Sequence, residues 1–268
     1  MKLLKDYTIL FDEQCPICNA YANSLVKSGM IESRAAYQQV DYSNVDMQRA
    51  VNEIALVNNK TGEVQYGIKS IFVVFGNSFP FLKPLFSFAP FVWVMSKLYL
   101  FISYNRRVIA PPHDPDAEYK IQPTLRKDYR VIYLLVTGFI AVFIFSRFMM
   151  PLHTLFAVGN KYSEYLILFS HLIIQSVIVG VFYKEKLWAY AGNMMTVYLI
   201  GSFLLLPALI VSAFTGLNYI VYLIYFIVVF ILMLAMHIRR VKLIRASQVL
   251  TISWLITFIL SRCLYLLV

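Results

Sequence analysis

Charge is scarce in this sequence, and acidic residues almost disappear from its second half. Charged side chains make up 14% of the 268 residues, against roughly 25% in an average soluble domain. Of the 14 acidic residues, 12 lie within 1–130, and only Glu164 and Glu185 lie beyond. This scarcity argues against a single water-soluble globule. The first half has the composition of a soluble domain, whereas 131–268 is basic and overwhelmingly apolar, as in a membrane domain.

Cysteine is also rare, and no secretory signal opens the chain. Three cysteines are too few for a disulfide scaffold, because Cys15 and Cys18 are close neighbours and Cys263 lies deep in the last apolar run. The early apolar run 7–11 is too short for the core of a signal peptide, and acidic residues follow it at once. We therefore expect residues 1–130 to remain on the side of the membrane where they are made.

Five apolar segments in the second half are long enough to cross a bilayer. A helix needs about 20 residues to span a hydrocarbon layer roughly 30 Å thick. A window of that length predicts spans at 131–150, 164–183, 188–213, 218–237 and 249–268. The expected fold class is thus an all-α transmembrane helical domain of about five spans, over 131–268, preceded by an N-terminal domain.

The basic residues around these spans predict the orientation of the chain. Nine Lys and Arg side chains flank the spans on one side and two on the other, and Lys and Arg favour the cytoplasmic side. This predicts a multi-pass protein of the cell (inner) membrane, with the N-terminal domain in the cytoplasm and the C-terminus outside. Because the cations lie between apolar runs and form no continuous patch, we expect no nucleic-acid partner.

The segment 79–107 is apolar but differs from a membrane span. Prolines interrupt its first part, and Ser96, Lys97, Ser103 and Arg107 recur at helical spacing opposite a broad face of Phe, Trp and Leu. We interpret the segment as an interfacial or core helix rather than a sixth span.

Strand and helix signals alternate within the first 78 residues. The expected strands are 7–11, 36–40, 53–57 and 63–66, and the expected helices are 15–30, 44–51 and a segment that includes 71–75. The polar, glycine-ended stretch 58–62 predicts a hairpin turn. Strand–helix–strand–helix–strand–strand–helix is the order of an α/β thioredoxin-like domain, which we place at 1–110, with a proline-rich linker over 111–130.

The sharpest motif is a pair of cysteines at the expected junction of the first strand and the first helix. Cys15 and Cys18 flank Pro16 and Ile17, and proline is well tolerated in the first turn of a helix. The unpaired N–H groups and the helix dipole favour a thiolate there, which predicts a lowered pKa and a nucleophilic role for Cys15. Cys18 would resolve a mixed disulfide, and Asp12 is the expected general base for the proton of Cys18.

Two other interpretations of the cysteine pair stay open. A zinc site would need further ligands, but the chain has no second cysteine pair and its nearest histidine in sequence is His113, so we predict no metal. Alternatively, the two cysteines are buried and unreactive. The motif, its strand context and a cytoplasmic setting, where structural disulfides are rare, together favour redox chemistry.

With these residues in view, the sequence resembles the DCC family of thiol-disulfide oxidoreductase-like proteins, a branch with a thioredoxin-like fold. The family pattern Asp-x-x-Cys-x-x-Cys matches Asp12, Cys15 and Cys18. Residues 62–67 resemble the family's hairpin ending in Tyr-x-Gly, and 98–107 resemble its closing helix with an Asn-Arg pair. The resemblance covers about residues 5–110. It implies disulfide exchange with a thiol or disulfide substrate, either a protein or a small molecule.

One feature of thioredoxins is missing. Thioredoxins place a cis-proline just before the third strand, facing the dithiol, whereas residues 51–53 here are Val-Asn-Glu. That proline holds substrate backbone and disfavours metal binding, so its absence leaves zinc open and motivates a second hypothesis. In this hypothesis the chain is a membrane-anchored binding or assembly module with a regulatory or vestigial dithiol.

Polar residues inside the predicted spans invite functional interpretations, because they are costly in lipid. His171 and Gln175 lie four residues apart on one helix face and could bind a quinone or a haem, although we expect no cofactor besides the redox-active dithiol. We favour a structural hydrogen bond to Asn193 or Thr196 of the third span. The second half holds a single cysteine, so the spans cannot relay electrons by dithiol exchange alone.

Overall fold

The computed structural model describes residues 2–40, 43–112, 123–154, 163–216 and 218–266, with side chains described as far as Ser261. The chain forms two compact units, Met1–Tyr129 and Arg130–Val268. Half of the predicted linker 111–130, residues 113–122, lies outside the described residues, and a helix begins at Lys127, before the predicted end of the linker. Each unit is considered by itself below.

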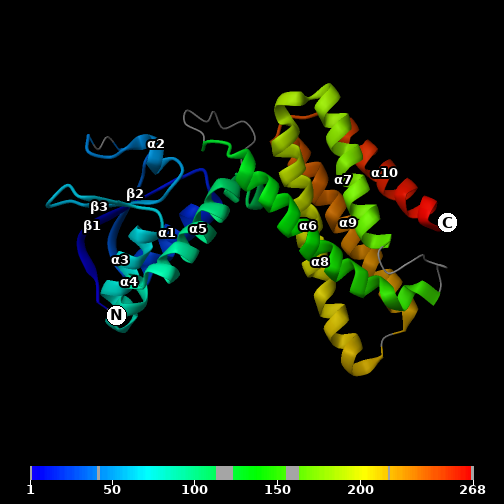
Figure 1. Ribbon diagram of the computed structural model, residues 1–268, viewed down its shortest axis with the longest axis horizontal. Coiled ribbons are helices and arrows are strands. Elements are labelled where there is room, and N and C mark those ends of the chain that lie inside the picture. The colour runs from blue at the N-terminus through cyan, green and yellow to red at the C-terminus, as the bar shows by residue number, and fades with distance from the viewer. Residues whose placement is uncertain (1, 41–42, 113–122, 155–162, 217, 267–268) are drawn as a thin grey trace. The chain divides into compact units, whose positions relative to one another are not determined.

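The first unit contains a four-stranded mixed sheet and its flanking helices (Figure 1). Its elements begin in the order β1 (Leu4–Phe11), α1 (Pro16–Lys27), β2 (Ile31–Ala36), α2 (Met47–Ala50), β3 (Ala55–Asn58), β4 (Val64–Tyr66) and α3 (Ile68–Ser78). This order confirms the alternation expected from the sequence. The strand order across the sheet is β2-β1-β3-β4, with β1 parallel to β2 and antiparallel to β3, and β3 antiparallel to β4.

One strand was placed wrongly by the sequence patterns. The predicted strand 36–40 is wrong, because β2 spans Ile31–Ala36 and a turn follows it. Strand β2 lies at the edge of the sheet, and its residues Ile-Glu-Ser-Arg-Ala-Ala include three consecutive polar side chains. They therefore resemble a polar loop when the sequence is scanned for apolar runs. The helix predicted to reach residue 30 ends at Lys27, shortly before Gly29, whose positive φ of 69° cannot continue a helix.

The two faces of the sheet are covered by different elements. Alternation along β1 sends Ile9 to one face and Leu10 to the other. Ile9 packs with Cys18 and Leu25 of α1 and with Val74 of α3, while Leu10 belongs to a separate cluster formed with residues in and around α2. Helices α1 and α3 therefore share one face of the sheet, and the amino end of α1 lies within its apolar core.

The segment predicted as an interfacial or core helix is divided into three helices. They are a 3-10 turn (Pro80–Leu82), α4 (Lys83–Ser87) and α5 (Ala89–Ile109). The pair Pro80–Ser87 and Ala89–Ile109 is apolar enough to resemble a span but is bent by 89°. The bend follows from Pro90, which lies in the first turn of α5 and is disfavoured in a helix that continues from α4.

The second unit consists of helices. They are α6 (Lys127–Met149, which begins in the first unit), α7 (Ser163–Phe182), α8 (Leu187–Thr215), α9 (Tyr219–Leu243) and α10 (Val249–Leu266), with short 3-10 turns at Met150–Thr154 and Lys184–Lys186. Among the described residues, the four helices α6 to α9 are long and apolar enough to cross a membrane. The number of candidate spans becomes five if the bent pair Pro80–Ser87 and Ala89–Ile109 of the first unit is counted as one. Four of the five predicted spans thus correspond to such helices. The fifth, 249–268, lies partly outside the described side chains and stays a prediction.

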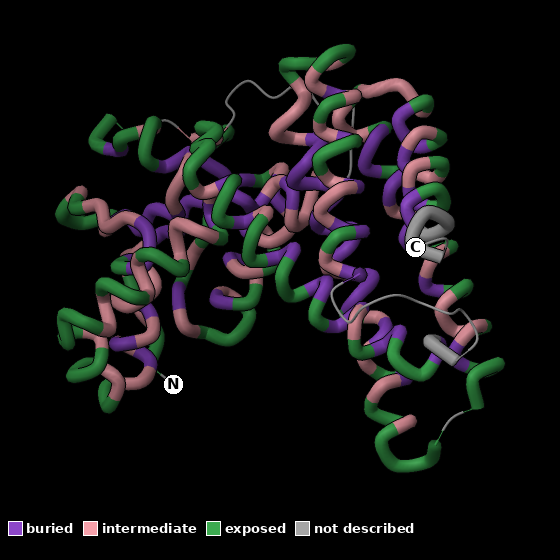
Figure 2. Tube along the Cα trace, turned by 45° about the vertical axis from the view of Figure 1, so that its right-hand side comes forward, coloured by how far each residue is buried: buried purple, intermediate pink, exposed green. Residues whose placement is uncertain are grey.

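The second unit buries polar side chains and exposes apolar ones. Large apolar residues such as Phe139, Val177 and Ile224 are exposed along its helices, whereas His171, Gln175 and other polar groups are fully buried. Figure 2 shows exposed stretches recurring along these helices between buried ones. Helix α8 packs against α9, and α7 packs against α10. This inverted distribution fits a bundle whose surroundings are lipid rather than water.

Candidate functional site

The two cysteines lie where β1 passes into α1. Cys15 is the N-cap residue of α1, with extended backbone angles, and Pro16 occupies the first helical position. The Cys15 N–H donates to the carbonyl of Asp12 (3.1 Å), and the Cys15 sulfur accepts the N–H of Cys18 (3.4 Å). A side chain at this position usually accepts one of the unpaired N–H groups of the first turn, and here the acceptor is the sulfur.

The surroundings separate the acidities of the two thiols. The hydrogen bond from the Cys18 side chain, together with its backbone N–H and the charge of Arg106, lowers the pKa of Cys15 to about 7 despite burial. The same hydrogen bond and burial raise the pKa of Cys18 well above its usual range. A thiolate therefore forms at Cys15 first, and Cys18 keeps its proton until that bond is lost.

Both thiols are covered by protein. Cys15 is 2% exposed and Cys18 is 9% exposed, and both pack in the apolar cluster between the sheet and helices α1 and α3. The carboxyl end of α5 also reaches this region, because Arg106 and Arg107 contact Asp12, which precedes Cys15 by three residues. A disulfide substrate cannot contact the Cys15 sulfur without some displacement of these surroundings.

Asp12 is the centre of a buried charge network. Its Oδ2 accepts from Arg106 (3.1 Å) and Arg107 (3.2 Å), and its Oδ1 accepts from the Gln38 amide (2.9 Å) and the Gln14 N–H (3.1 Å). Its side chain is 1% exposed. Four hydrogen bonds fill the accepting capacity of a carboxylate. Asp12 can therefore take a proton from Cys18 only after one of these bonds is released.

Arg106 connects this network to the turn before β3. Its Nη2 also donates to the carbonyl of Val51 (2.7 Å), and its Nη1 lies 3.4 Å from the carbonyl of Asn52. The Ser103 hydroxyl donates to the same Asn52 carbonyl. The turn before β3 is thus held by α5 through side chains.

Tyr37 adds a further polar group near the charge network of Asp12 and Arg106. Its hydroxyl is buried and has no hydrogen-bond partner among the described residues. Burial and the negative charge of Asp12 raise the pKa of Tyr37 above its usual range. Sequence reasoning assigned no site role to Tyr37 or Arg106. The signal for Arg106 was indirect, because a carboxylate at the end of a buried strand needs a cation, but nothing local shows which one.

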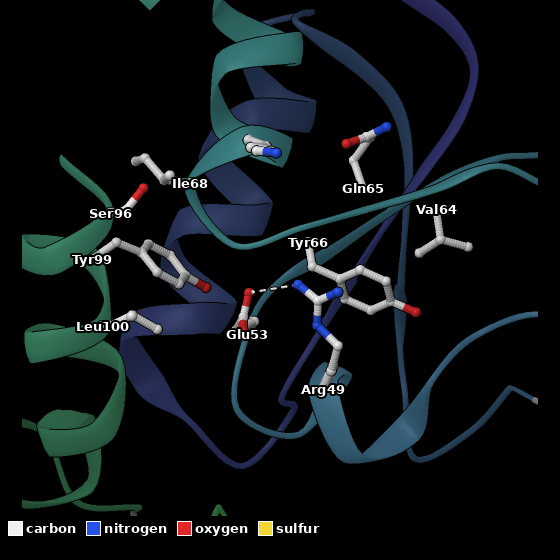
Figure 3. A pocket seen from close by; sticks show the side chains of 10 residues that line it. Arg49, Glu53, Val64, Gln65, Tyr66, Ile68, Ser96, Tyr99 and Leu100 are labelled. Atoms are coloured by element: carbon white, nitrogen blue, oxygen red, sulfur yellow. Dashed lines mark hydrogen bonds and ion pairs between the residues drawn. The ribbon is translucent and has the colours of Figure 1, made fainter. Parts of the chain in front are cut away.

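A separate pocket of about 280 Å³ opens between α2, β4, α3 and α5. Figure 3 shows Arg49 against the ring of Tyr66, 4.3 Å from its centroid, and paired with Glu53 at 3.5 Å. Gly67, between β4 and α3, has a φ of 65° that disfavours residues with a side chain, and a Cβ added there would lie 2.6 Å from Glu53 Oε2, so that the Glu53 side chain would have to shift. None of the three predicted site residues lines the pocket.

No metal centre is found in the part of the chain that the structure describes. There, no group of three or more His, Cys, Asp or Glu side chains lies close enough to hold a metal ion. The charges that act on both thiols include those of Asp12 and Arg106, and a guanidinium group would oppose a bound cation.

The predicted polar pair of the second unit has other partners than expected. His171 bonds the Tyr198 hydroxyl, and Gln175 binds Thr257 (2.8 Å) and accepts from Tyr190 (2.9 Å). The third predicted span does supply two of these partners, Tyr190 and Tyr198. The predicted hydrogen bond from this pair to Asn193 or Thr196 is wrong. Those two side chains bond elsewhere, because Asn193 accepts from Arg240 (2.8 Å) and Thr196 bonds the Tyr133 hydroxyl (2.7 Å). The quinone hypothesis stays a prediction.

Comparisons of the chain with protein-family models, with curated proteins and with solved structures give no match.

Proposed function

We propose that the chain is a membrane-anchored thiol-disulfide oxidoreductase that exchanges disulfides through Cys15 and Cys18. The observation that carries the proposal is the N-cap position of Cys15, where the sulfur accepts the Cys18 N–H and the pKa falls to about 7. A thiolate available at neutral pH next to a second thiol is the requirement for such exchange.

The sheet supports a thioredoxin-like fold for this domain and, with it, the resemblance to the DCC family. The strand order β2-β1-β3-β4, the parallel β1–β2 pair joined through α1, and the antiparallel β3–β4 hairpin leading into α3 match that layout. Helices α1 and α3 share one face, and the dithiol begins the first of them.

The reaction balances with two thiols and one disulfide. The Cys15 thiolate attacks a substrate disulfide, so that a Cys15–substrate disulfide forms and the first substrate thiolate leaves. Cys18 then loses its proton and attacks the Cys15 sulfur, which releases the second substrate thiol and forms the Cys15–Cys18 disulfide. Two electrons pass from the protein to the substrate, and the reverse sequence oxidises a dithiol.

Asp12 is the proposed acceptor of the Cys18 proton. Because its carboxylate is fully bonded, this step follows the release of an arginine contact, and the same release would uncover Cys15. Opening at the carboxyl end of α5 would thus provide access and a proton acceptor together.

The proposed location is the cytoplasmic face of the cell (inner) membrane. Support comes from the apolar helices of the second unit and from the nine-to-two distribution of Lys and Arg around the predicted spans. In this orientation the C-terminus lies outside. The proposed partners are a thiol or disulfide substrate and the lipid bilayer.

The test uses the full chain in lipid vesicles and an aromatic disulfide whose released thiol is coloured. The wild-type reduced protein should release thiol and form the Cys15–Cys18 disulfide, and Cys15→Ser should abolish both. Cys18→Ser should stop at a stable mixed disulfide on Cys15, detected by mass. Equal thiol release by wild type and Cys15→Ser would reject the proposal.

The burial of Cys15 favours a second candidate, a membrane-anchored binding or assembly module with a regulatory or vestigial dithiol. A titration of the Cys15–Cys18 pair against mixtures of reduced and oxidised glutathione separates the two candidate functions. A Cys15 pKa near the unperturbed 8.5 or so, with no disulfide formed at any glutathione potential, would support the module.

A further inference from the structure

Helix α5 is inverted relative to a helix on the surface of a water-soluble domain. Its polar residues Ser103, Asn105 and Arg106 are buried and bonded within the first unit. Its large apolar residues Trp93 and Leu98 are 65% and 51% exposed. A surface helix normally has the opposite arrangement, with the apolar stripe toward the core.

The exposed apolar residues form one continuous surface. Trp93, Val94, Leu98 and Ile102 recur at helical spacing on the outer side of α5, and we call them the α5 stripe. Before α5 begins, Phe81 and Phe88 are 77% and 58% exposed as well. A stripe of exposed apolar side chains of this kind marks a surface that meets another apolar phase or partner.

Helix α4 is held against this region by stacked rings. Phe86 of α4 stacks on Phe72 of α3 with ring centroids 4.4 Å apart, and Phe91 of α5 stacks on Phe72 at 5.8 Å. The inner aromatic residues are thus used for packing, while the outer ones are left exposed. The exposure of the α5 stripe is therefore a property of a packed helix.

Charge around the α5 stripe has one sign. Between Glu63 and Asp114 the sequence has no acidic residue, but it has five Lys and Arg residues. Lys97 lies within the stripe, and both Lys97 and Lys83 are exposed. A cationic, apolar surface complements the anionic headgroups and acyl chains of a bilayer, and it would repel a second copy of the same basic surface.

We propose that the α5 stripe lies at the boundary between the headgroups and the acyl chains of the bilayer that holds the second unit. Trp93 occupies the interfacial layer preferred by tryptophan, and the Lys97 stem extends along the apolar surface so that its ammonium group reaches lipid phosphates. The first unit then lies on the membrane surface instead of being joined to it by the chain alone. This inference is independent of the dithiol chemistry.

The test measures the depth of Trp93 by fluorescence in the full chain, reconstituted in vesicles that contain phosphatidylglycerol. The chain has three tryptophans, so the difference between wild type and Trp93→Phe isolates the Trp93 emission. We expect lipids brominated on their acyl chains to remove most of this emission, and iodide in the aqueous phase to remove little.

A matched control uses an exposed apolar residue outside the stripe. Leu3 is 37% exposed. The emission that Leu3→Trp adds to the Trp93→Phe chain should be quenched by iodide and not by the brominated lipids. Lys97→Glu should reduce quenching of Trp93 by brominated lipid, because an acidic group at this depth is repelled by phosphatidylglycerol.

Two results would overturn the inference. Quenching of Trp93 by iodide alone would show that the stripe faces water. Protection from both quenchers would show that a protein surface covers it, either the second unit or another copy of the chain.

Discussion

The two units of this protein bury polar groups in different ways. The first unit buries an ion pair, Asp12 with Arg106, inside an otherwise apolar core beside a mixed sheet. The second unit buries a hydrogen-bonded network that includes Gln175, Tyr190 and His237, as well as charged side chains such as Arg240, while many of its large apolar side chains are exposed. The difference follows from the surroundings, because water drives apolar groups inside one unit, whereas lipid leaves polar hydrogen bonds to hold the other together.

The largest change in the free energy of unfolding is expected when one partner of the buried ion pair in the first unit is removed. Arg106→Ala leaves the Asp12 carboxylate buried with fewer partners, and loss of one member of a buried pair costs about 3–5 kcal/mol. The free energy of unfolding of the first unit can be measured from the urea dependence of Cys18 alkylation in the full chain. Arg126→Ala, which breaks the exposed pair with Asp128, is the matched control and should change little. Equal effects of the two variants would contradict the role of Arg106.

The next effect is the pH dependence of Cys15. With a pKa of about 7, roughly half of Cys15 is thiolate at pH 7, against about one-thirtieth for a thiol with the ordinary pKa of about 8.5. Because the folded pKa of Cys15 is the lower one, its thiolate stabilises the fold above the unfolded pKa, and this contribution is lost as the pH falls through about 7. The alkylation rate of Cys15 in Cys18→Ser cannot report this value, because Cys18 helps to lower it. The wild-type rate, with the labelled peptide identified by mass, should have its midpoint near pH 7.

A smaller effect is expected at the turn between β4 and α3. Gly67→Ala must adopt a positive φ, which costs about 1–2 kcal/mol for a residue with a side chain, and its Cβ would meet Glu53. The same urea titration should show the loss. Gly180→Ala in α7 is the control, because nothing lies within 4 Å of the added Cβ and its φ is helical.

The smallest effect is expected in the second unit. Gln175→Leu removes hydrogen bonds to Tyr190 and Thr257, and such bonds between membrane helices average about 0.6 kcal/mol. Unfolding of the reconstituted chain in a denaturing detergent can measure this change. A loss as large as that of Arg106→Ala would mean that the two units do not differ in the way proposed.

Much of the fold could be predicted from local patterns. The positions of β1, α1 and the β3–β4 hairpin followed from apolar runs, a helix-start motif and a polar turn, all of which act over a few residues. Four membrane-length helices followed from length and composition. The edge strand β2 was misplaced, because its residues are largely polar and its place in the sheet depends on pairing with β1, which the local pattern does not reveal.

The sequence by itself determined that Cys15 would begin a helix, because capping and the dipole of the first turn are local. Only the tertiary structure decided that Arg106, 94 residues away, would bind Asp12, and that the polar side of α5 would face inward. Such pairings depend on how the chain closes on itself. A helical stripe shows which residues share a face, but the surrounding packing decides which face meets protein and which is left exposed.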